Sequence, residues 1–172
     1  MTDDLFKKIK AFFFDIDGVL TDGSVLVLEN GLQARRMSIR DGFALQLAVK
    51  TGYHVVAVSG SSPSPVVERL RNLGVTEVYM SVLNKSAFIT SYMEKHKLSA
   101  TNVLYMGDDL PDLPVMSIAG LAACPADAVA EIIDVAHYIS PLNGGYGCAR
   151  DVIEKVLRLN GQWHFREDVA SL

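Results

Sequence analysis

An uncharged apolar run that ends in two aspartates constrains this chain more than any other stretch. Residues 11–14 read Ala-Phe-Phe-Phe, and Asp15, Ile16, Asp17 and Gly18 follow at once. A run of this kind, without alternating polar residues, is typical of a strand buried on both faces in a parallel sheet. Ligands of open α/β sheets bind beyond the carboxyl ends of the strands. We therefore expect Asp15 and Asp17 to project into a crevice at the edge of a sheet.

The spacing of these two carboxylates has two interpretations. Two carboxylates this close repel each other, and a divalent cation relieves the repulsion. Proteins bind Mg²⁺ through a few carboxylates together with water and substrate phosphate. The simpler alternative is that Asp15 and Asp17 only begin a turn before Gly18. Further polar residues at other strand ends would favour a magnesium-dependent phosphate site over a simple turn.

Short apolar segments alternate with helical patterns through most of the chain. Strands are predicted at 55–58, 75–80, 103–106, 121–123 and, at an edge, 137–139; helices are predicted at 43–50, 63–72, 84–96, 113–118, 126–133 and 149–159. This alternation predicts an α/β fold, a Rossmann-like three-layer αβα arrangement with a central parallel sheet. At 172 residues the chain is expected to form a single domain, 1–172.

Polar residues stand at three further strand ends or helix starts. The lysine among them, Lys85, opens a predicted helix, where its charge opposes the helix dipole unless an anion binds there. A solvated lysine is the alternative. The three groups are Ser59 with Gly60, Lys85, and the acidic set Asp108, Asp109 and Asp112.

Taken in order, these four groups resemble the motifs of the haloacid dehalogenase superfamily. The resemblance implies that Asp15 is a nucleophile that accepts a phosphoryl group, and that Asp17 protonates the leaving oxygen and then activates water. It also implies that Mg²⁺ is held by Asp15, Asp108 and the backbone carbonyl of Asp17. Ser59, Gly60 and Lys85 would bind the phosphate. Asp109 and Asp112 would not bind the metal directly but would hold water molecules and Lys85 in place.

A finer resemblance is to a tetrameric branch of the superfamily that lacks a cap domain and acts on eight-carbon 3-deoxy sugar acid phosphates. Its matching stretches are 15–23, a hairpin, 40–42, 84–85, 107–112 and 144–145. There is no room for a cap between Asp17 and Ser59 or between Lys85 and Asp108. The resemblance implies lipopolysaccharide sugar synthesis and a small-molecule sugar-acid phosphate as substrate. It implies substrate contacts from Ser38, Ile39, Arg40, Asp41, Gly42 and Arg69.

Residues 24–38 carry a strong hairpin signal, because Asn30-Gly31 stands between two extended segments. The first arm is apolar and would be an aggregation hazard if exposed, so it is expected to pack on another subunit. The alternative is that it folds back onto its own core. The resemblance implies a homotetramer assembled through these hairpins, with the tail, 160–172, covering a neighbour's site. Aromatic residues in that tail favour docking on a surface.

Two positions depart from the pattern of this branch. Many relatives have a basic residue where this chain has Ser61, and often one where it has Tyr146. Both changes remove cations from the expected mouth of the site and leave the identity of the sugar acid open. A nine-carbon 3-deoxy sugar acid phosphate is the nearest alternative substrate. A phosphoryl-accepting receiver-like regulatory domain and a non-catalytic activator subunit are alternatives outside catalysis.

The remaining sequence features exclude several partner classes. A net charge of −4 argues against nucleic acid as the main partner. No run approaches the roughly 18 apolar residues of a membrane span. Two widely spaced cysteines, Cys124 and Cys148, are expected to be reduced thiols in a cytoplasmic protein. The four scattered histidines show no metal-ligand spacing and are expected to be structural or at the surface.

Overall fold

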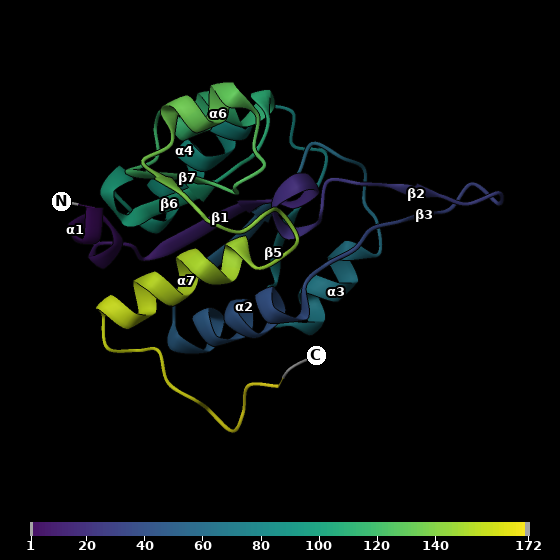
Figure 1. Ribbon diagram of the computed structural model, residues 1–172. Helices are drawn as coiled ribbons and strands as arrows, with labels where there is room; N and C mark the ends of the chain where they lie inside the picture. The colour runs from purple at the N-terminus through teal and green to yellow at the C-terminus, as the bar shows by residue number, and fades with distance from the viewer. Residues whose placement is uncertain (1, 171–172) are drawn as a thin grey trace.

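Six parallel strands form one sheet in the computed structural model, which describes residues 2–170. The sheet lies between two layers of helices (Figure 1). The sheet order is β5-β4-β1-β6-β7-β8, and every neighbouring pair is parallel. Its strands are β1 (Ala11–Asp15), β4 (His54–Val58), β5 (Glu77–Tyr79), β6 (Val103–Met106), β7 (Leu121–Cys124) and β8 (Tyr138–Ile139). The chain leaves β1 for β4 on one side and reaches β6 on the other, so β1 lies where the strand order reverses. The predicted α/β architecture is confirmed.

Alternation along β1 explains its continuous apolar sequence. Phe12 and Phe14 point into one core, while Phe13 points into the other, where its ring lies 5.1 Å from that of Tyr92. All three phenylalanines are fully buried. Because both faces of a central strand are covered by helices, neither face can carry polar side chains.

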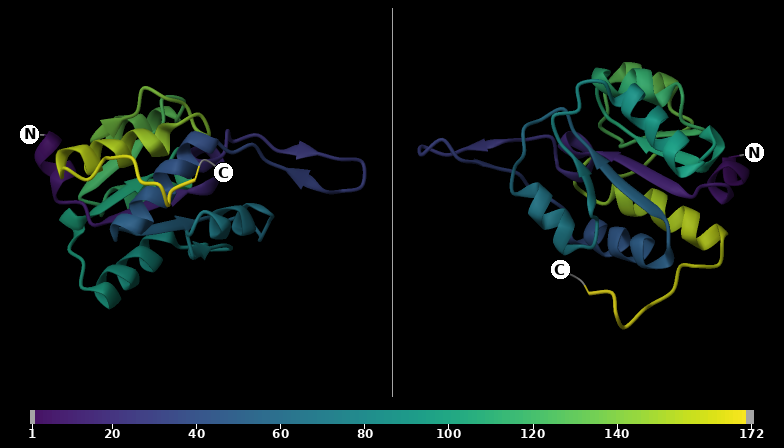
Figure 2. Two further views of the ribbon diagram at one scale, coloured as in Figure 1. Left: turned by 90° about the horizontal axis from the view of Figure 1, so that it is seen from below. Right: turned by 180° about the vertical axis from the view of Figure 1, so that it is seen from behind.

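The helices divide between the two faces of the sheet. One face is covered by α2 (Ile39–Thr51), α3 (Val66–Asn72) and α7 (Cys148–Leu159), and the other by α4 (Lys85–His96), α5 (Leu113–Met116) and α6 (Ala130–Val135) (Figures 1 and 2). The short helix α1 (Thr2–Lys7), which the sequence analysis did not predict, packs against α7. A 3₁₀ turn over Leu110–Asp112 precedes α5, and another over Ala100–Asn102 precedes β6.

Two predicted helix boundaries were wrong by a full turn. Helix α2 begins at Ile39 rather than at residue 43, because the hydroxyl of Ser38 accepts the backbone N–H groups of Arg40 and Asp41 and so caps the helix. Helix α6 begins at Ala130 rather than at residue 126. The backbone N–H of Val129 donates to the carbonyl of Asp108, 2.9 Å away, which ties the segment before α6 to the end of β6.

The hairpin is present and extends away from the sheet. Strands β2 (Leu26–Val27) and β3 (Gln33–Ala34) pair antiparallel, and the arm projects beyond the carboxyl ends of the parallel strands (Figures 1 and 2). Leu26, Val27 and Leu32 are 63–67% exposed. The alternative that this apolar arm folds back onto its own core was therefore wrong.

The described part of the tail docks on its own chain. Trp163 packs edge-on against Phe43 of α2, and the carbonyl of Ala170 accepts a 2.7 Å hydrogen bond from the Gln46 side chain. This confirms docking on a surface; the last two residues of the predicted tail lie outside the described residues.

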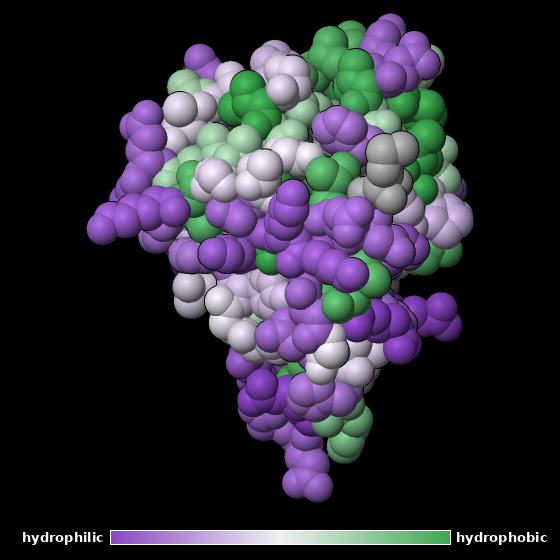
Figure 3. Space-filling model, turned by 90° about the vertical axis from the view of Figure 1, so that its left-hand side faces the viewer, coloured by the Kyte–Doolittle hydropathy of each residue, from purple (hydrophilic) through white to green (hydrophobic). Residues whose placement is uncertain are grey.

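Figure 3 shows the end of the molecule opposite the hairpin, where α1 lies. Hydrophilic residues form a band across the middle of this face. Among the residues that the structure describes, no helix is both long and apolar enough to cross a membrane.

Candidate active site

A tight turn of π-type after β1 builds the first part of the site. It runs over Ile16–Leu20 directly after Asp15, and Gly18 adopts a φ of +95° within it. A β-carbon at Gly18 would overlap with the Asp108 carboxylate. Glycine is therefore needed both for the backbone conformation and for the close approach of Asp108, which follows the neighbouring strand β6.

A cavity of about 450 Å³ opens at this edge of the sheet. The predicted catalytic, metal, phosphate and outer acidic residues all line it. These are Asp15, Asp17, Ser59, Gly60, Lys85, Asp108, Asp109 and Asp112. Residues that are distant in sequence thus come together because the strands that precede them are neighbours in a parallel sheet.

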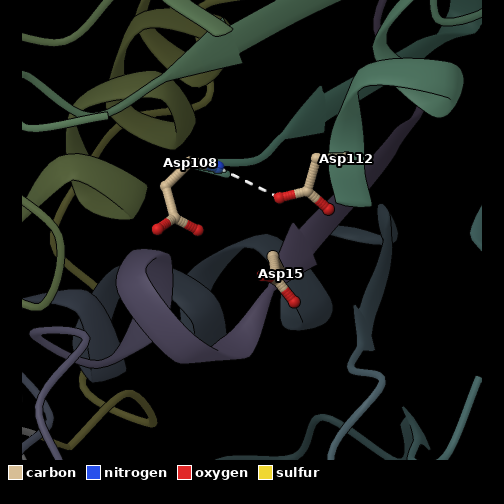
Figure 4. Close-up of side chains that lie close together, drawn as sticks. All are labelled: Asp15, Asp108 and Asp112. Atoms are coloured by element: carbon tan, nitrogen blue, oxygen red, sulfur yellow. Dashed lines mark hydrogen bonds between the residues drawn. The ribbon is translucent and has the colours of Figure 1, made fainter. Parts of the chain in front are cut away.

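Three of these carboxylates form a cluster. Asp15, Asp108 and Asp112 each offer one oxygen atom, and these oxygens all lie within 4.8 Å of one another (Figure 4). Asp15 comes from the end of β1, while the other two come from the loop after β6. Carboxylates crowded in this way repel one another unless cations or protons share the site.

One cation of the site is Lys85, the first residue of α4. Its ammonium group lies 2.9 Å from Asp15 Oδ1 and 2.6 Å from Asp112 Oδ1, and its side chain is buried. Asp112 also accepts hydrogen bonds from the Tyr105 hydroxyl at 2.5 Å and from the backbone N–H of Asp108 at 3.0 Å. Both oxygens of Asp112 are thus engaged, and the prediction that Asp112 holds Lys85 agrees with this geometry.

The protonation equilibria reflect the crowding. Burial, followed by repulsion from Asp112, raises the pKa of Asp15 to about 6, although Lys85 opposes the shift. Burial and then repulsion from Asp15 and Asp112 raise the pKa of Asp108 to about 8. Burial disfavours the charge on Lys85, but Asp15 and Asp112 outweigh it and raise the pKa of the ammonium group.

The acidic cluster fits a hard divalent cation. Asp108 Oδ1 is buried and has no hydrogen-bond partner among the described residues, which is costly for a carboxylate. Mg²⁺ ligated by this oxygen and by Asp15 would satisfy it. The backbone carbonyl of Asp17 stays a predicted third ligand.

Asp17 has two partners that the sequence analysis missed. Arg35 donates from Nε to Asp17 Oδ1 at 2.6 Å, and the hydroxyl of Ser61 donates to Oδ2 at 2.7 Å. Arg35 lies just after β3, 18 residues from Asp17, and no local pattern signals the contact. From the sequence, Ser61 stands out only as a position without the basic residue that many relatives have.

The residues predicted to bind phosphate after β4 lie at the end of that strand and line the cavity. Ser59 follows β4 and is buried, and its hydroxyl accepts the backbone N–H of Ser61 at 3.0 Å. Gly60 is exposed to the cavity. Asp109 is exposed as well, and its carboxylate accepts the N–H of Leu110.

The predicted substrate contacts lie outside this cavity. Ile39 and Arg69 line a neighbouring cavity of about 540 Å³, together with Arg35. The two cavities meet at the Arg35–Asp17 ion pair. Arg40 lines a third cavity with Tyr146.

Three further predicted contacts serve the fold. Ser38 caps α2, and a β-carbon at Gly42 would press on the Arg69 guanidinium. Asp41 is buried and accepts the backbone N–H groups of Gly147 and Arg150 at 3.1 and 2.7 Å. The Asp41 side chain therefore holds the start of α7, and its contact with substrate stays a prediction.

A parallel α/β sheet with an aspartate at the end of its central strand, an acidic cluster and a buried lysine at the carboxyl ends of its strands defines a phosphate hydrolase of the haloacid dehalogenase class. Residues 74–150 match the model of haloacid dehalogenase-like hydrolases. The chain is 33% identical over 156 residues to the 3-deoxy-D-manno-octulosonate 8-phosphate phosphatase of Escherichia coli strain K12, a match covering 91% of this chain and 83% of that protein. The chain belongs to this phosphatase family.

Solved structures agree with this assignment. The 3-deoxy-D-manno-octulosonate 8-phosphate phosphatase of Yersinia pestis superposes with a TM-score of 0.90 at 27% identity, covering 94% of this chain and 87% of that one. The enzyme of Moraxella catarrhalis, solved in complex with a magnesium ion, a phosphate ion and a KDO molecule, gives 0.88 at 28% identity, covering 92% and 91%. The predicted resemblance, phosphatase activity and Mg²⁺ cofactor are confirmed, and the two non-catalytic alternatives are set aside.

Proposed function

We propose that this protein hydrolyses 3-deoxy-D-manno-octulosonate 8-phosphate to the free sugar acid and phosphate in lipopolysaccharide sugar synthesis. The observation that carries the proposal is the position of Asp15 at the end of β1, 2.9 Å from Lys85 and beside the unsatisfied oxygen of Asp108. The substrate class comes from the family relatives.

In the first step a carboxylate oxygen of Asp15 attacks phosphorus. The bond between phosphorus and the sugar oxygen breaks, and Asp17 gives a proton to that oxygen, because a sugar alkoxide is too basic to leave unaided. The product is an aspartyl phosphate on Asp15, which divides one hard displacement into two easier ones.

In the second step Asp17 takes a proton from water, which attacks the phosphorus of the aspartyl phosphate and restores Asp15. Lys85, the hydroxyl of Ser59 and the backbone of Gly60 hold the phosphate oxygens through both steps. Mg²⁺, when bound, neutralises charge on the transferred group.

The neighbouring cavity of about 540 Å³ is the proposed site for the sugar acid. Its lining includes Arg69, and a guanidinium group suits a carboxylate through paired hydrogen bonds. A nine-carbon 3-deoxy sugar acid phosphate is the alternative substrate, since the same predicted contacts suit a sugar acid of either length.

Phosphate release with Mg²⁺ from the eight-carbon and nine-carbon acid phosphates tests the proposal. We expect a higher kcat/KM for the eight-carbon acid and no activity in Asp15→Ala with either. A preference for the nine-carbon acid would replace the substrate and keep the chemistry. Activity in Asp15→Ala would contradict the mechanism.

A homotetramer assembled through the hairpins is also proposed, supported by the exposed leucine and valine side chains of β2. The double variant Leu26→Lys, Val27→Asp should reduce the molar mass measured by light scattering. Val135→Lys, an exposed apolar position on α6, is the control. An unchanged mass in the double variant would contradict this assembly. The neighbour's tail over the site and the cytoplasmic location stay predictions.

A further inference from the structure

The carboxylate of Asp17 is held from two sides by elements that are far apart in the sequence. Arg35, on the returning arm of the hairpin, binds Oδ1, and Ser61, in the loop after β4, binds Oδ2. The side chain of Arg35 is only 11% exposed, whereas its neighbour Arg36 is 70% exposed. A long charged side chain is rarely buried this far on a projecting arm unless it has a partner there.

The two donors differ in whether the Asp17 oxygen that each one contacts can carry a proton. A guanidinium group has no acceptor atom, so Oδ1 remains tied to Arg35 as an acceptor. A hydroxyl can donate or accept, so Ser61 remains a partner to Oδ2 whether or not that oxygen carries a proton. The oxygen available to exchange a proton with the leaving group is therefore Oδ2.

The base of the hairpin is fixed in the same region. Thr21 and Met37 form an isolated antiparallel bridge across it. Arg36 donates to the Tyr146 hydroxyl at 3.0 Å and lies 4.0 Å from Asp22. These contacts join the arm that carries Arg35 to the segment that directly follows the turn carrying Asp17.

From these contacts we propose that Arg35 is a positioning residue, which aims the Asp17 carboxylate at the leaving group and links the hairpin to proton transfer. The inference rests on the proposed role of Asp17 as acid and base. It assigns a function to the hairpin arm in addition to any contact between subunits. Arg35 acts through Asp17 in this account and need not touch the sugar acid.

The dependence of activity on the leaving group provides the test. A poorly leaving alkyl oxygen needs the proton from Asp17, whereas p-nitrophenolate leaves without one. We would measure kcat/KM with Mg²⁺ for p-nitrophenyl phosphate and for an alkyl phosphate, neither of which carries a carboxylate, in the wild type and in each variant. Substrates without a carboxylate separate positioning of Asp17 from binding of the sugar acid.

Arg35→Gln should lower kcat/KM for the alkyl ester by about tenfold or more, which is part of the roughly 10²–10⁴-fold that general acid catalysis contributes. The aryl ester should lose much less. Arg35→Lys, which keeps a donor and the charge, should recover part of the loss. Arg71→Gln, at an exposed position of α3, is the control and should stay close to wild type with both esters.

Equal losses for the two esters in Arg35→Gln would overturn the inference, as would the absence of any loss. Melting temperatures identify a variant that fails to fold, and Arg35→Lys then carries the same comparison. A wild type that releases no phosphate from 3-deoxy-D-manno-octulosonate 8-phosphate would contradict the proposed function itself. A wild type that is active, with variants that lose both esters equally, would contradict only the role of Arg35.

Discussion

Lys85 Nζ lies 2.9 Å from Asp15 Oδ1, so the lysine at the start of α4 directly contacts the carboxylate at the end of β1. The same ammonium group donates to Asp112 at 2.6 Å. One buried cation therefore offsets two of the three clustered carboxylates and remains available to a phosphate oxygen. The position explains why a lysine stands where the helix dipole would disfavour it.

Lys85→Met should lower kcat/KM by about 10²–10³-fold, the range observed when a single donor to a developing negative charge is removed. The variant should also melt at a lower temperature, because Asp112 loses a charged donor in a buried setting. Steady-state phosphate release and thermal unfolding check both effects. Lys95→Met, at an exposed position of the same helix, is the control. Wild-type activity in Lys85→Met would contradict the placement of phosphate at this lysine.

The raised pKa of Asp108 leads to a specific pH dependence of the free energy of unfolding. Its pKa rises from 3.8 to about 8 in the folded protein, so the folded state binds this proton more tightly than the unfolded state. Without Mg²⁺ its contribution to stability is therefore fully present below about pH 4 and is lost as the pH rises through about 8. Asp108→Asn should melt above the metal-free wild type near pH 8, with a smaller difference at pH 5.

Added Mg²⁺ should stabilise the wild type and have little effect on Asp108→Asn, because binding to the folded state alone raises its stability. Melting curves at several pH values, with chelator and with Mg²⁺, provide the measurement. A difference between variant and wild type that does not change with pH would show that the crowding of Asp108 is not the cause.

Gly18→Ala should abolish Mg²⁺-dependent activity, since a β-carbon there would overlap with the Asp108 carboxylate. Gly52 provides a close control: its φ is +97°, compared with +95° at Gly18, but nothing lies within 4 Å of its β-carbon position. Gly52→Ala should therefore show only the backbone cost of a left-handed residue, about 1–2 kcal/mol. Both variants need activity and thermal unfolding measurements. Equal loss of activity in the two would rule out a specific clash at Gly18.

Asp41→Ala distinguishes a structural from a substrate-binding carboxylate. The change leaves the backbone N–H groups of Gly147 and Arg150 without their acceptor, at a cost of about 1–3 kcal/mol for each buried donor that stays unsatisfied. We expect a lower melting temperature and a KM close to wild type at a temperature where the variant is folded. A raised KM with unchanged stability would contradict the structural role and support the substrate role predicted from the sequence.

The parts of the site that follow from strand order could be predicted from the sequence. Apolar runs identified β1, β4 and β6, and parallel pairing brings their carboxyl ends to one edge, so Asp15, Ser59 and Asp108 had to converge. The asparagine–glycine turn likewise identified the hairpin, although not the direction in which it projects.

Contacts between distant segments could not be predicted in this way. The Arg35–Asp17 pair depends on how the hairpin leaves the turn after β1, and no periodicity records that angle. Asp41 was assigned to substrate by resemblance, while its partners lie more than 100 residues later, at the start of α7. The start of α2 is a different case, because Ser38 before the helix was a capping signal that the prediction did not use.

The central claim is that phosphoryl transfer passes through Asp15. Wild-type protein with Mg²⁺ and the eight-carbon sugar acid phosphate would be stopped with acid during turnover, and its peptides analysed by mass spectrometry. The account predicts a phosphoryl group on the peptide containing Asp15, at Asp15 itself, and neither this label nor phosphate release in Asp15→Ala. Steady phosphate release by Asp15→Ala, or a phosphoryl group on another residue, would contradict the account.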